Sequence, residues 1–183
     1  GTGTGVTKVD FTDTIYLEAG YANIITEASG YQVDGLRVIS NKGTTGSENL
    51  FLGQSGNFTT TGTNNIFAGY QAGNGVTSGY SNNFLGYQAG YTNGTGFSNT
   101  FIGYQAGYTN STGSNDIFLG QYAGYRQTAS NTFMVDSPTV ARASIAVEQA
   151  NALIYGIFAD TAALQTFRVN AATVNFPNLP LLF

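Results

Sequence analysis

The chain has 183 residues, a formal net charge of −4 and only 9% charged residues, whereas typical globular proteins contain about 25%. Its six Lys and Arg residues cannot form the clustered basic surface that phosphate binding needs within one chain, so we do not expect nucleic acid as a partner. The absence of Cys and His excludes disulfides, zinc fingers, cysteine nucleophiles and imidazole catalysis. No run approaches the roughly 18 apolar residues of a membrane helix, which argues against membrane insertion.

Residues 1–45 are expected to form an N-terminal β segment. Apolar and polar residues alternate around Val9–Phe11, Ile15–Leu17 and Leu36–Ile39, which is the pattern of half-buried strands. Asp34-Gly35 has the composition of a turn between two such strands. The chain lacks an initiator Met, so we expect a processed product or a fragment.

A phrase of the form Asn-x-Phe-x-Gly recurs through residues 46–136. Its five copies begin at Asn49, Asn65, Asn82, Asn99 and Asp116, and they contain Phe51, Phe67, Phe84, Phe101 and Phe118. A sixth, degenerate copy, Asn131-Thr-Phe-Met-Val135, places Phe133 in the same column. The steps of 16 or 17 residues between the five full copies indicate one short stacked unit. We therefore predict an all-β solenoid or β-roll with about five 16–17-residue coils and short β segments at both ends.

The Asn column of the repeat consists of Asn49, Asn65, Asn82, Asn99 and Asn131. We interpret it as a ladder of side chains that hydrogen-bond to their neighbours above and below, and a ligand groove is the less favoured alternative. Residues on the other side of the same segments, such as Ile66, Leu85 and Ile102, are also apolar. A thin solenoid has one interior of its own, so the second apolar side indicates that identical chains associate.

Charge is nearly absent from the repeats, because Asp116 is the only acid or base, tyrosines aside, between Asn49 and Tyr125. Such a neutral surface would make an unpaired monomer poorly soluble, which again favours association. Asp116 stands where other copies have Asn, so we interpret it as a variant of the ladder. The chain offers no evident carboxylate pair, phosphate loop, nucleophile elbow or metal-ligand cluster, so we expect neither catalysis nor a cofactor nor a metal.

Tyr91, Tyr108 and Tyr125 follow Ala-Gly in successive copies and are expected to form a row on one side of the chain. Packing between chains is the favoured interpretation of this row. The alternative is a platform for sugar rings, since an aromatic face beside a hydroxyl suits carbohydrate.

Residues 137–183 are expected to form a C-terminal β segment. Thr166–Asn170 and Thr173–Phe176 have the alternation of strands, whereas Ala141–Gln149 is also compatible with a helix. The apolar ending, Phe176–Phe183, is expected to pack against another surface.

The repeat Asn-x-Phe-Leu-Gly-Tyr-Gln-Ala-Gly-Tyr resembles repeats of phage tail fibres and of bacterial surface proteins related to the heads of trimeric autotransporter adhesins. Ser130–Asp136 and Ala152–Phe158 resemble the segment that follows such repeats and often leads to an endosialidase-type intramolecular chaperone, which is cut off after assembly. The resemblance implies a homotrimer on a virion, as a tail fibre or surface appendage, that attaches to a host-surface glycan or protein. A bacterial surface adhesin or extracellular filament subunit is the alternative.

Overall fold

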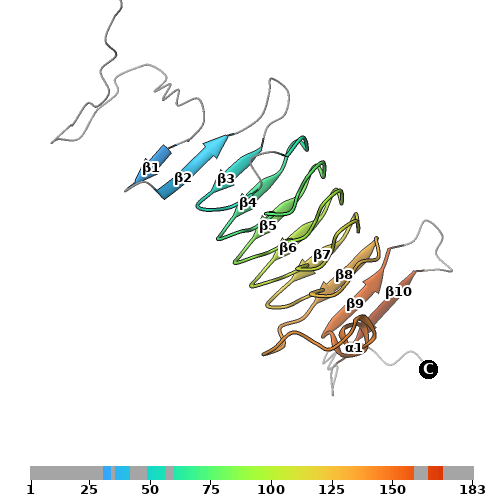
Figure 1. The fold of residues 1–183 in the computed structure, drawn as a ribbon. Coiled ribbons are helices and arrows are strands. Elements are labelled where there is room, and N and C mark those ends of the chain that lie inside the picture. Colours follow the sequence, from blue (N-terminus) through green and yellow to red (C-terminus); the bar gives the residue numbers. More distant parts are fainter. Residues whose placement is uncertain (1–30, 34–35, 42–48, 57–59, 159–164, 171–183) are drawn as a thin grey trace, which may run out of the picture.

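The computed structural model describes residues 31–33, 36–41, 49–56, 60–158 and 165–170, and within them the backbone forms one sheet of ten strands and one short helix. Figure 1 shows the strands side by side in chain order along an elongated body. The strands are β1 Tyr31–Val33, β2 Leu36–Asn41, β3 Leu50–Leu52, β4 Ile66–Ala68, β5 Asn83–Leu85, β6 Thr100–Ile102, β7 Ile117–Leu119, β8 Thr132–Val135, β9 Ile154–Ile157 and β10 Thr166–Val169. The helix is α1, Ile145–Asn151.

The central strands β3 to β8 are parallel, and each pairs with the strand one coil further along the chain. Antiparallel pairs extend this block at both ends, with β1 and β2 before β3, and β9 and β10 after β8. This arrangement confirms the predicted all-β solenoid of about five turns. Coils one to five are named here by their first residues, Asn49, Asn65, Asn82, Asn99 and Asp116.

Stacked phenylalanines form the core of the solenoid. Phe84, Phe101 and Phe118 are fully buried, and their ring centroids lie 4.8 and 4.7 Å apart with nearly parallel planes. The small residue Gly107 leaves the space that the ring of Phe101 fills, because a Cβ at Gly107 would collide with that ring. Gly107 also has a φ of +61°, a backbone conformation that side chains disfavour.

The last copy of the repeat is aligned differently from the prediction. Phe118 pairs with Met134, so Met134 and not Phe133 continues the buried column, and Phe133 lies on the opposite face of the strand. Thr132, and not the predicted Asn131, follows Asp116 in the polar column, because the Thr132 backbone N–H donates to Asp116 Oδ1. Asn131 adopts a φ of +62°, as Asn115 does one coil earlier, and Asn tolerates this conformation better than most residues. The step from coil five to this last copy, from Phe118 to Met134, is therefore 16 residues.

The C-terminal segment contains a helix as well as strands. Helix α1 begins after Ser144, whose hydroxyl accepts a hydrogen bond from Val147 N–H, so the helical alternative for this stretch is correct over Ile145–Asn151. The strand expected at Thr166–Asn170 corresponds to β10. The carbonyls of Ala150 and Ala152 accept hydrogen bonds from Asn170, which ties the end of α1 to the end of β10.

The strand expected at Leu36–Ile39 lies within β2. The other N-terminal predictions, Val9–Phe11, Ile15–Leu17 and the Asp34-Gly35 turn, lie outside the described residues, as do Thr173–Phe176 and the apolar ending.

Substitutions at Phe101 and Gly107 should be strongly coupled. We expect Phe101→Ala to lower the free energy of unfolding by about 3–5 kcal/mol per chain, and Gly107→Ala to destabilise through the collision with the Phe101 ring. In the double variant the collision is gone, so its loss of unfolding free energy should be smaller than the sum of the losses in the two single variants. Denaturant unfolding of the four proteins measures this, and full additivity would show that the ring of Phe101 does not fill the space beside Gly107.

Candidate functional site

The turns after β4 to β7 carry a set of exposed and half-buried polar and aromatic side chains. Backbone hydrogen bonds continue around each turn, since Gln88 N–H donates to the Tyr70 carbonyl and Gln105 N–H to the Tyr87 carbonyl, both at 2.8 Å. Equivalent residues of successive coils are thereby held in register. Each residue type of the turn becomes a row parallel to the solenoid axis.

Tyr91, Tyr108 and Tyr125 form the row that the sequence predicts. Their ring centroids lie 5.0 and 4.9 Å apart, the planes differ by at most 5°, and the side chains are half-buried. The Arg126 guanidinium lies 5.5 Å from the centre of the Tyr125 ring at the end of the row. Because the rings cover one another's faces, the row presents mainly ring edges and hydroxyls, which differs from the face-on platform of the sequence-based alternative.

A second tyrosine row lies on the same turns. Tyr70, Tyr87 and Tyr104 are 47%, 41% and 43% exposed. Their centroids are 5.5 and 5.0 Å apart. The prediction from sequence selected only the tyrosines after Ala-Gly, although the same period repeats the tyrosine before Gln. The equal spacing of the two tyrosine sets was the signal that could have identified this row.

A ladder of glutamine side chains runs between the two rows. Gln88 Nε2 donates to Gln71 Oε1 at 2.8 Å, and Gln105 Nε2 donates to Gln88 Oε1 at 2.6 Å. In coil five the order is exchanged and Tyr122 holds the glutamine position. Its ring contacts Tyr104 at 5.3 Å and Tyr125 at 5.7 Å, one ring from each row, which places the ladder between them.

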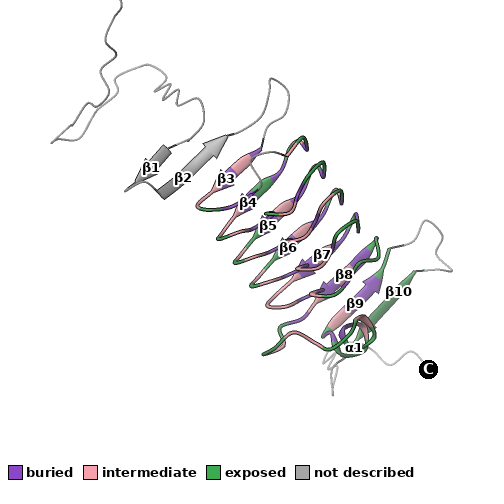
Figure 2. Ribbon diagram, in the orientation of Figure 1, coloured by how far each residue is buried: buried purple, intermediate pink, exposed green. Residues whose placement is uncertain are grey.

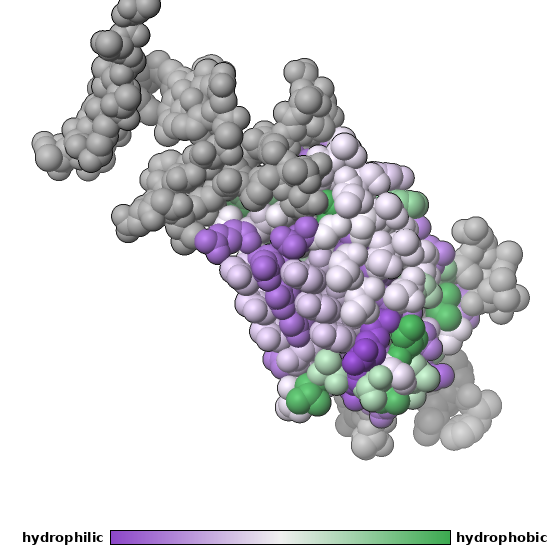
Figure 3. Space-filling view, in the orientation of Figure 1, coloured by the Kyte–Doolittle hydropathy of each residue, from purple (hydrophilic) through white to green (hydrophobic). Residues whose placement is uncertain are grey.

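We call this surface the Tyr/Gln strip. Figure 3 shows a hydrophilic stripe that follows the turns at the C-terminal ends of the central strands. The strip spans coils two to five and consists of Tyr70, Gln71, Tyr87, Gln88, Tyr91, Tyr104, Gln105, Tyr108, Tyr122 and Tyr125.

The asparagine column lies inside the coils. Asn49, Asn65, Asn82 and Asn99 are at most 2% exposed, so they cannot line a surface groove. The amide oxygen of Asn65 accepts from Asn82 N–H at 2.9 Å, and the amide nitrogen of Asn65 donates to the Gly79 carbonyl at 2.9 Å. The same pattern recurs at the other rungs, so this column is a structural ladder.

Asp116 occupies a rung of that ladder. Its carboxylate accepts from Thr132 N–H and from Asn110 Nδ2, both at 2.8 Å, and its own N–H donates to Asn99 Oδ1. Asp suits this rung because both neighbours of its side chain are donors. Burial raises the pKa of Asp116 to about 6, although the two hydrogen bonds oppose the rise.

A second buried carboxyl closes the C-terminal end of the solenoid. Glu148 of α1 is 1% exposed, and its Oε1 accepts from Arg126 N–H at 2.8 Å. In earlier coils the equivalent N–H groups, such as that of Thr109, donate to a carbonyl of the next coil. Glu148 therefore supplies the acceptor that a carbonyl of the next coil provides elsewhere. Burial raises its pKa to about 7, and its Oε2 has no hydrogen-bond partner among the described residues.

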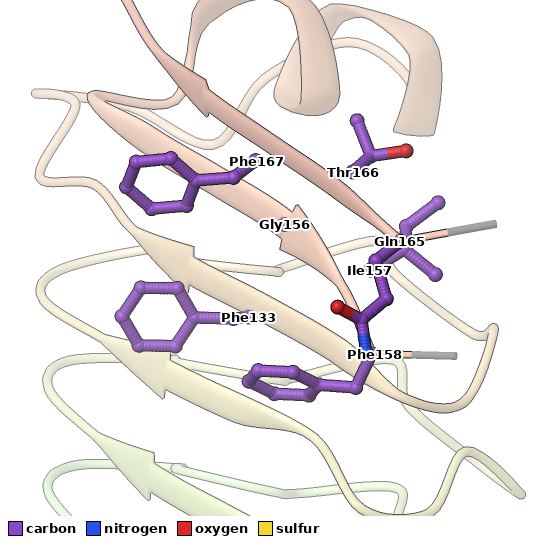
Figure 4. A pocket seen from close by; sticks show the side chains of 7 residues that line it. All are labelled: Phe133, Gly156, Ile157, Phe158, Gln165, Thr166 and Phe167. Carbon is purple, nitrogen blue, oxygen red and sulfur yellow. The ribbon is translucent and has the colours of Figure 1, made fainter. Parts of the chain in front are cut away.

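An apolar groove lies at the C-terminal end of the sheet and is lined by Phe133, Gly156, Phe158 and Phe167, among others. Gly156 pairs with Phe133 on one side and with Phe167 on the other, so all three face the same way. Figure 4 shows the rings of Phe133 and Phe167 flanking Gly156. Phe167 is 72% exposed. The groove continues the apolar outer side of the sheet.

No family model, curated protein or solved structure matches this chain. Among the described residues no helix has the length and apolar character needed to cross a membrane. Nor does that part of the chain bring together three or more acidic residues that could hold a metal ion.

The two buried carboxyls should make stability depend on pH. Their ordinary pKa values are 3.8 and 4.5, and both are raised in the folded protein, to about 6 and about 7. Protonated forms are thus favoured by folding, so the stability that these groups contribute is greatest below about pH 4, falls as pH rises from there, and is lost above about pH 6–7. Each group accounts for about 3 kcal/mol between these limits.

We expect Asp116→Asn and Glu148→Gln to flatten this dependence, because Asn and Gln keep a carbonyl acceptor but do not ionise. The measurement is the melting temperature of wild type, both single variants and the double variant at about pH 5 and about pH 8. Asp136→Asn is the comparison variant, since Asp136 is paired with Arg142 at 2.8 Å. Parallel curves for wild type and the double variant would contradict the assignment.

Proposed function

We propose that the protein is a structural and attachment module of a virion fibre or spike, assembled as a homotrimer. The observation that carries this proposal is the exposed apolar side of the sheet, here called the outer sheet face. It is composed of two rows, Leu50, Ile66, Asn83, Thr100, Ile117 and Phe133, and Leu52, Ala68, Leu85, Ile102, Leu119 and Val135.

The outer sheet face is apolar except at Asn83 and Thr100, and it is uncovered in a single chain. Ile66, Leu85 and Ile102 are 40%, 39% and 42% exposed, while the phenylalanines between the rows point inward and are fully buried. Figure 2 shows the same alternation along the central strands. Neither row contains an acid or a base. The second row is apolar throughout, and an exposed apolar surface of this kind marks an interface in soluble proteins.

An identical chain is the partner that fits this face best. Its rows have the same spacing along the axis, so parallel copies match row to row along the whole solenoid. The absence of charge means that no like-charge pairs oppose the contact. The groove beside Phe133 and Phe167 extends the same surface beyond the repeats.

The number of three copies and the location on a virion rest on the resemblance of the repeats to tail-fibre and trimeric adhesin repeats. In this role the protein supplies a rigid, protease-resistant body and presents its outer turns to a host surface, without catalysis. The alternative is a bacterial surface adhesin or extracellular filament subunit built from the same repeats. Mass spectrometry of purified virions and of host envelope fractions distinguishes the two, and we expect the chain in the virions.

Assembly is tested by a charge placed on the outer sheet face. We expect native mass spectrometry of wild type to give three chains, and Ile102→Glu to give folded monomers, because an unpaired buried carboxylate costs several kcal/mol in each copy. Ser111→Glu is the matched control, since Ser111 is exposed on the connection between β6 and β7 and belongs to neither row of this face. A monomeric wild type would contradict the trimer. A trimeric Ile102→Glu variant would show that the copies meet elsewhere.

A further inference from the structure

We propose that the Tyr/Gln strip binds a neutral, linear polysaccharide that lies parallel to the solenoid axis, with one sugar ring on each coil. This inference rests on the proposed attachment role and specifies its ligand. It includes Tyr70, Tyr87, Tyr104 and the glutamine ladder together with the tyrosine row that the sequence predicts.

The first support is the hydrogen-bonding capacity left on the glutamine ladder. A glutamine amide has two N–H donors and an oxygen that accepts twice. Gln88 uses one N–H on Gln71 and one lone pair on Gln105. One donor and one acceptor therefore remain at this rung for a partner outside the chain. Sugar hydroxyls both donate and accept, so they can satisfy such a pair with a single group.

The second support is the pair of tyrosine rows that flank the ladder. Tyr87 lies on one side and Tyr91 on the other within the same coil, and both types recur in coil four. Ring edges and hydroxyls on both sides provide apolar contact for the C–H groups of a sugar and further hydrogen bonds for its hydroxyls. The ladder then contacts the polar edge of the same ring.

The third support is the period of the strip. Within the two tyrosine rows, successive rings lie 4.9–5.0 Å apart in coils three to five, and 5.5 Å apart between Tyr70 and Tyr87. This is close to the separation of neighbouring strands, about 4.7–4.9 Å, and a pyranose ring in an extended, equatorially linked polysaccharide advances its chain by a comparable length. Contacts that are weak for one ring are then repeated by the next ring without a change of orientation.

The fourth support is the lack of charge. Gln71, Gln88 and Gln105 are neutral, and no Lys or Arg lies within coils one to four. Arg126, beside Tyr125, is the nearest cation in the sequence and lies at the end of the strip. A sulfated or sialylated chain would lose hydration of its anions without gaining partners. Neutral sugars are therefore the ligand class that matches the strip.

The experiment measures binding of wild-type protein to cello-, xylo-, manno- and chito-oligosaccharides of one to six units by calorimetry. We expect one of these series to bind, with affinity rising by about tenfold or more from two to four units, because successive contacts act as linked sites. Affinity should level off beyond about four units, since the strip covers coils two to five. Raising the salt concentration should change it little, because no ion pair is screened.

Two variants locate the site. Gln88→Gly removes the amide and suits the backbone there, because Gln88 has a φ of +52°. Tyr87→Phe removes one hydroxyl and keeps the ring. Each should lower affinity by about tenfold. Ser81→Gly is the matched control, since Ser81 also has a positive φ, +55°, and is exposed away from the strip.

The outcomes separate this inference from the proposed assembly. Absence of binding to all four series, or binding only to sialylated or sulfated chains or to a protein receptor, overturns the polysaccharide inference while a trimeric wild type leaves the assembly intact. Unchanged affinity in both variants overturns the location. Loss of the trimer in Gln88→Gly or Tyr87→Phe would show that the strip is an interface between chains, and this also overturns the inference.

Discussion

The rings of Phe84, Phe101 and Phe118 lie 4.8 and 4.7 Å apart, which is the separation of neighbouring strands. This match between ring stacking and strand pairing fixes the register of the coils, because a slip by one residue would turn every buried ring outward. Once register is fixed, each residue type of the repeat forms a row along the axis. The buried amides, the outer apolar rows and the tyrosines of the turns all depend on this single constraint. The outer surface is thus determined by the packing of the core.

Much of the fold follows from spacing alone, and the deviations have physical causes. A period of 16–17 residues with inward Asn and Phe predicts parallel coils, since only stacking gives every copy the same environment. The degenerate copy was aligned wrongly because Phe133 matches the motif by residue type, whereas Met134 fills the core at the required step. Single-residue register is decided by hydrogen bonds such as Thr132 N–H to Asp116 Oδ1, which residue type does not reveal. The period alone indicates a row that contains Tyr87, but its exposure and ring contacts depend on turn geometry, which the sequence does not reveal.

The C-terminal end illustrates what a repeat cannot predict about its own termination. An N–H of the last coil has no further coil to donate to, and Glu148 supplies the acceptor from a helix that lies outside the repeat. The pairing of Asp136 with Arg142 holds the intervening segment, and Arg142 also donates to the Asn151 carbonyl at the end of α1. The helix places the carboxyl of Glu148 within hydrogen-bonding distance of the Arg126 N–H. The sequence showed the helical composition but gave no indication of this contact.

Amide side chains form two ladders in this protein, one of buried asparagines and one of half-buried glutamines. They differ in how many of their hydrogen-bonding groups are already used within the chain. Asn65 uses its oxygen on Asn82 and its nitrogen on both Asn49 and Gly79, so this buried amide has no capacity left for donation to a ligand. Burial requires such saturation, because an unpaired amide inside a protein is costly. Gln88, on the turn, is bonded on one side of each polar atom and remains half-buried. Unused donors and acceptors are tolerated on the glutamine ladder because it lies at the surface. The glutamine ladder is therefore the one that can form hydrogen bonds with another molecule.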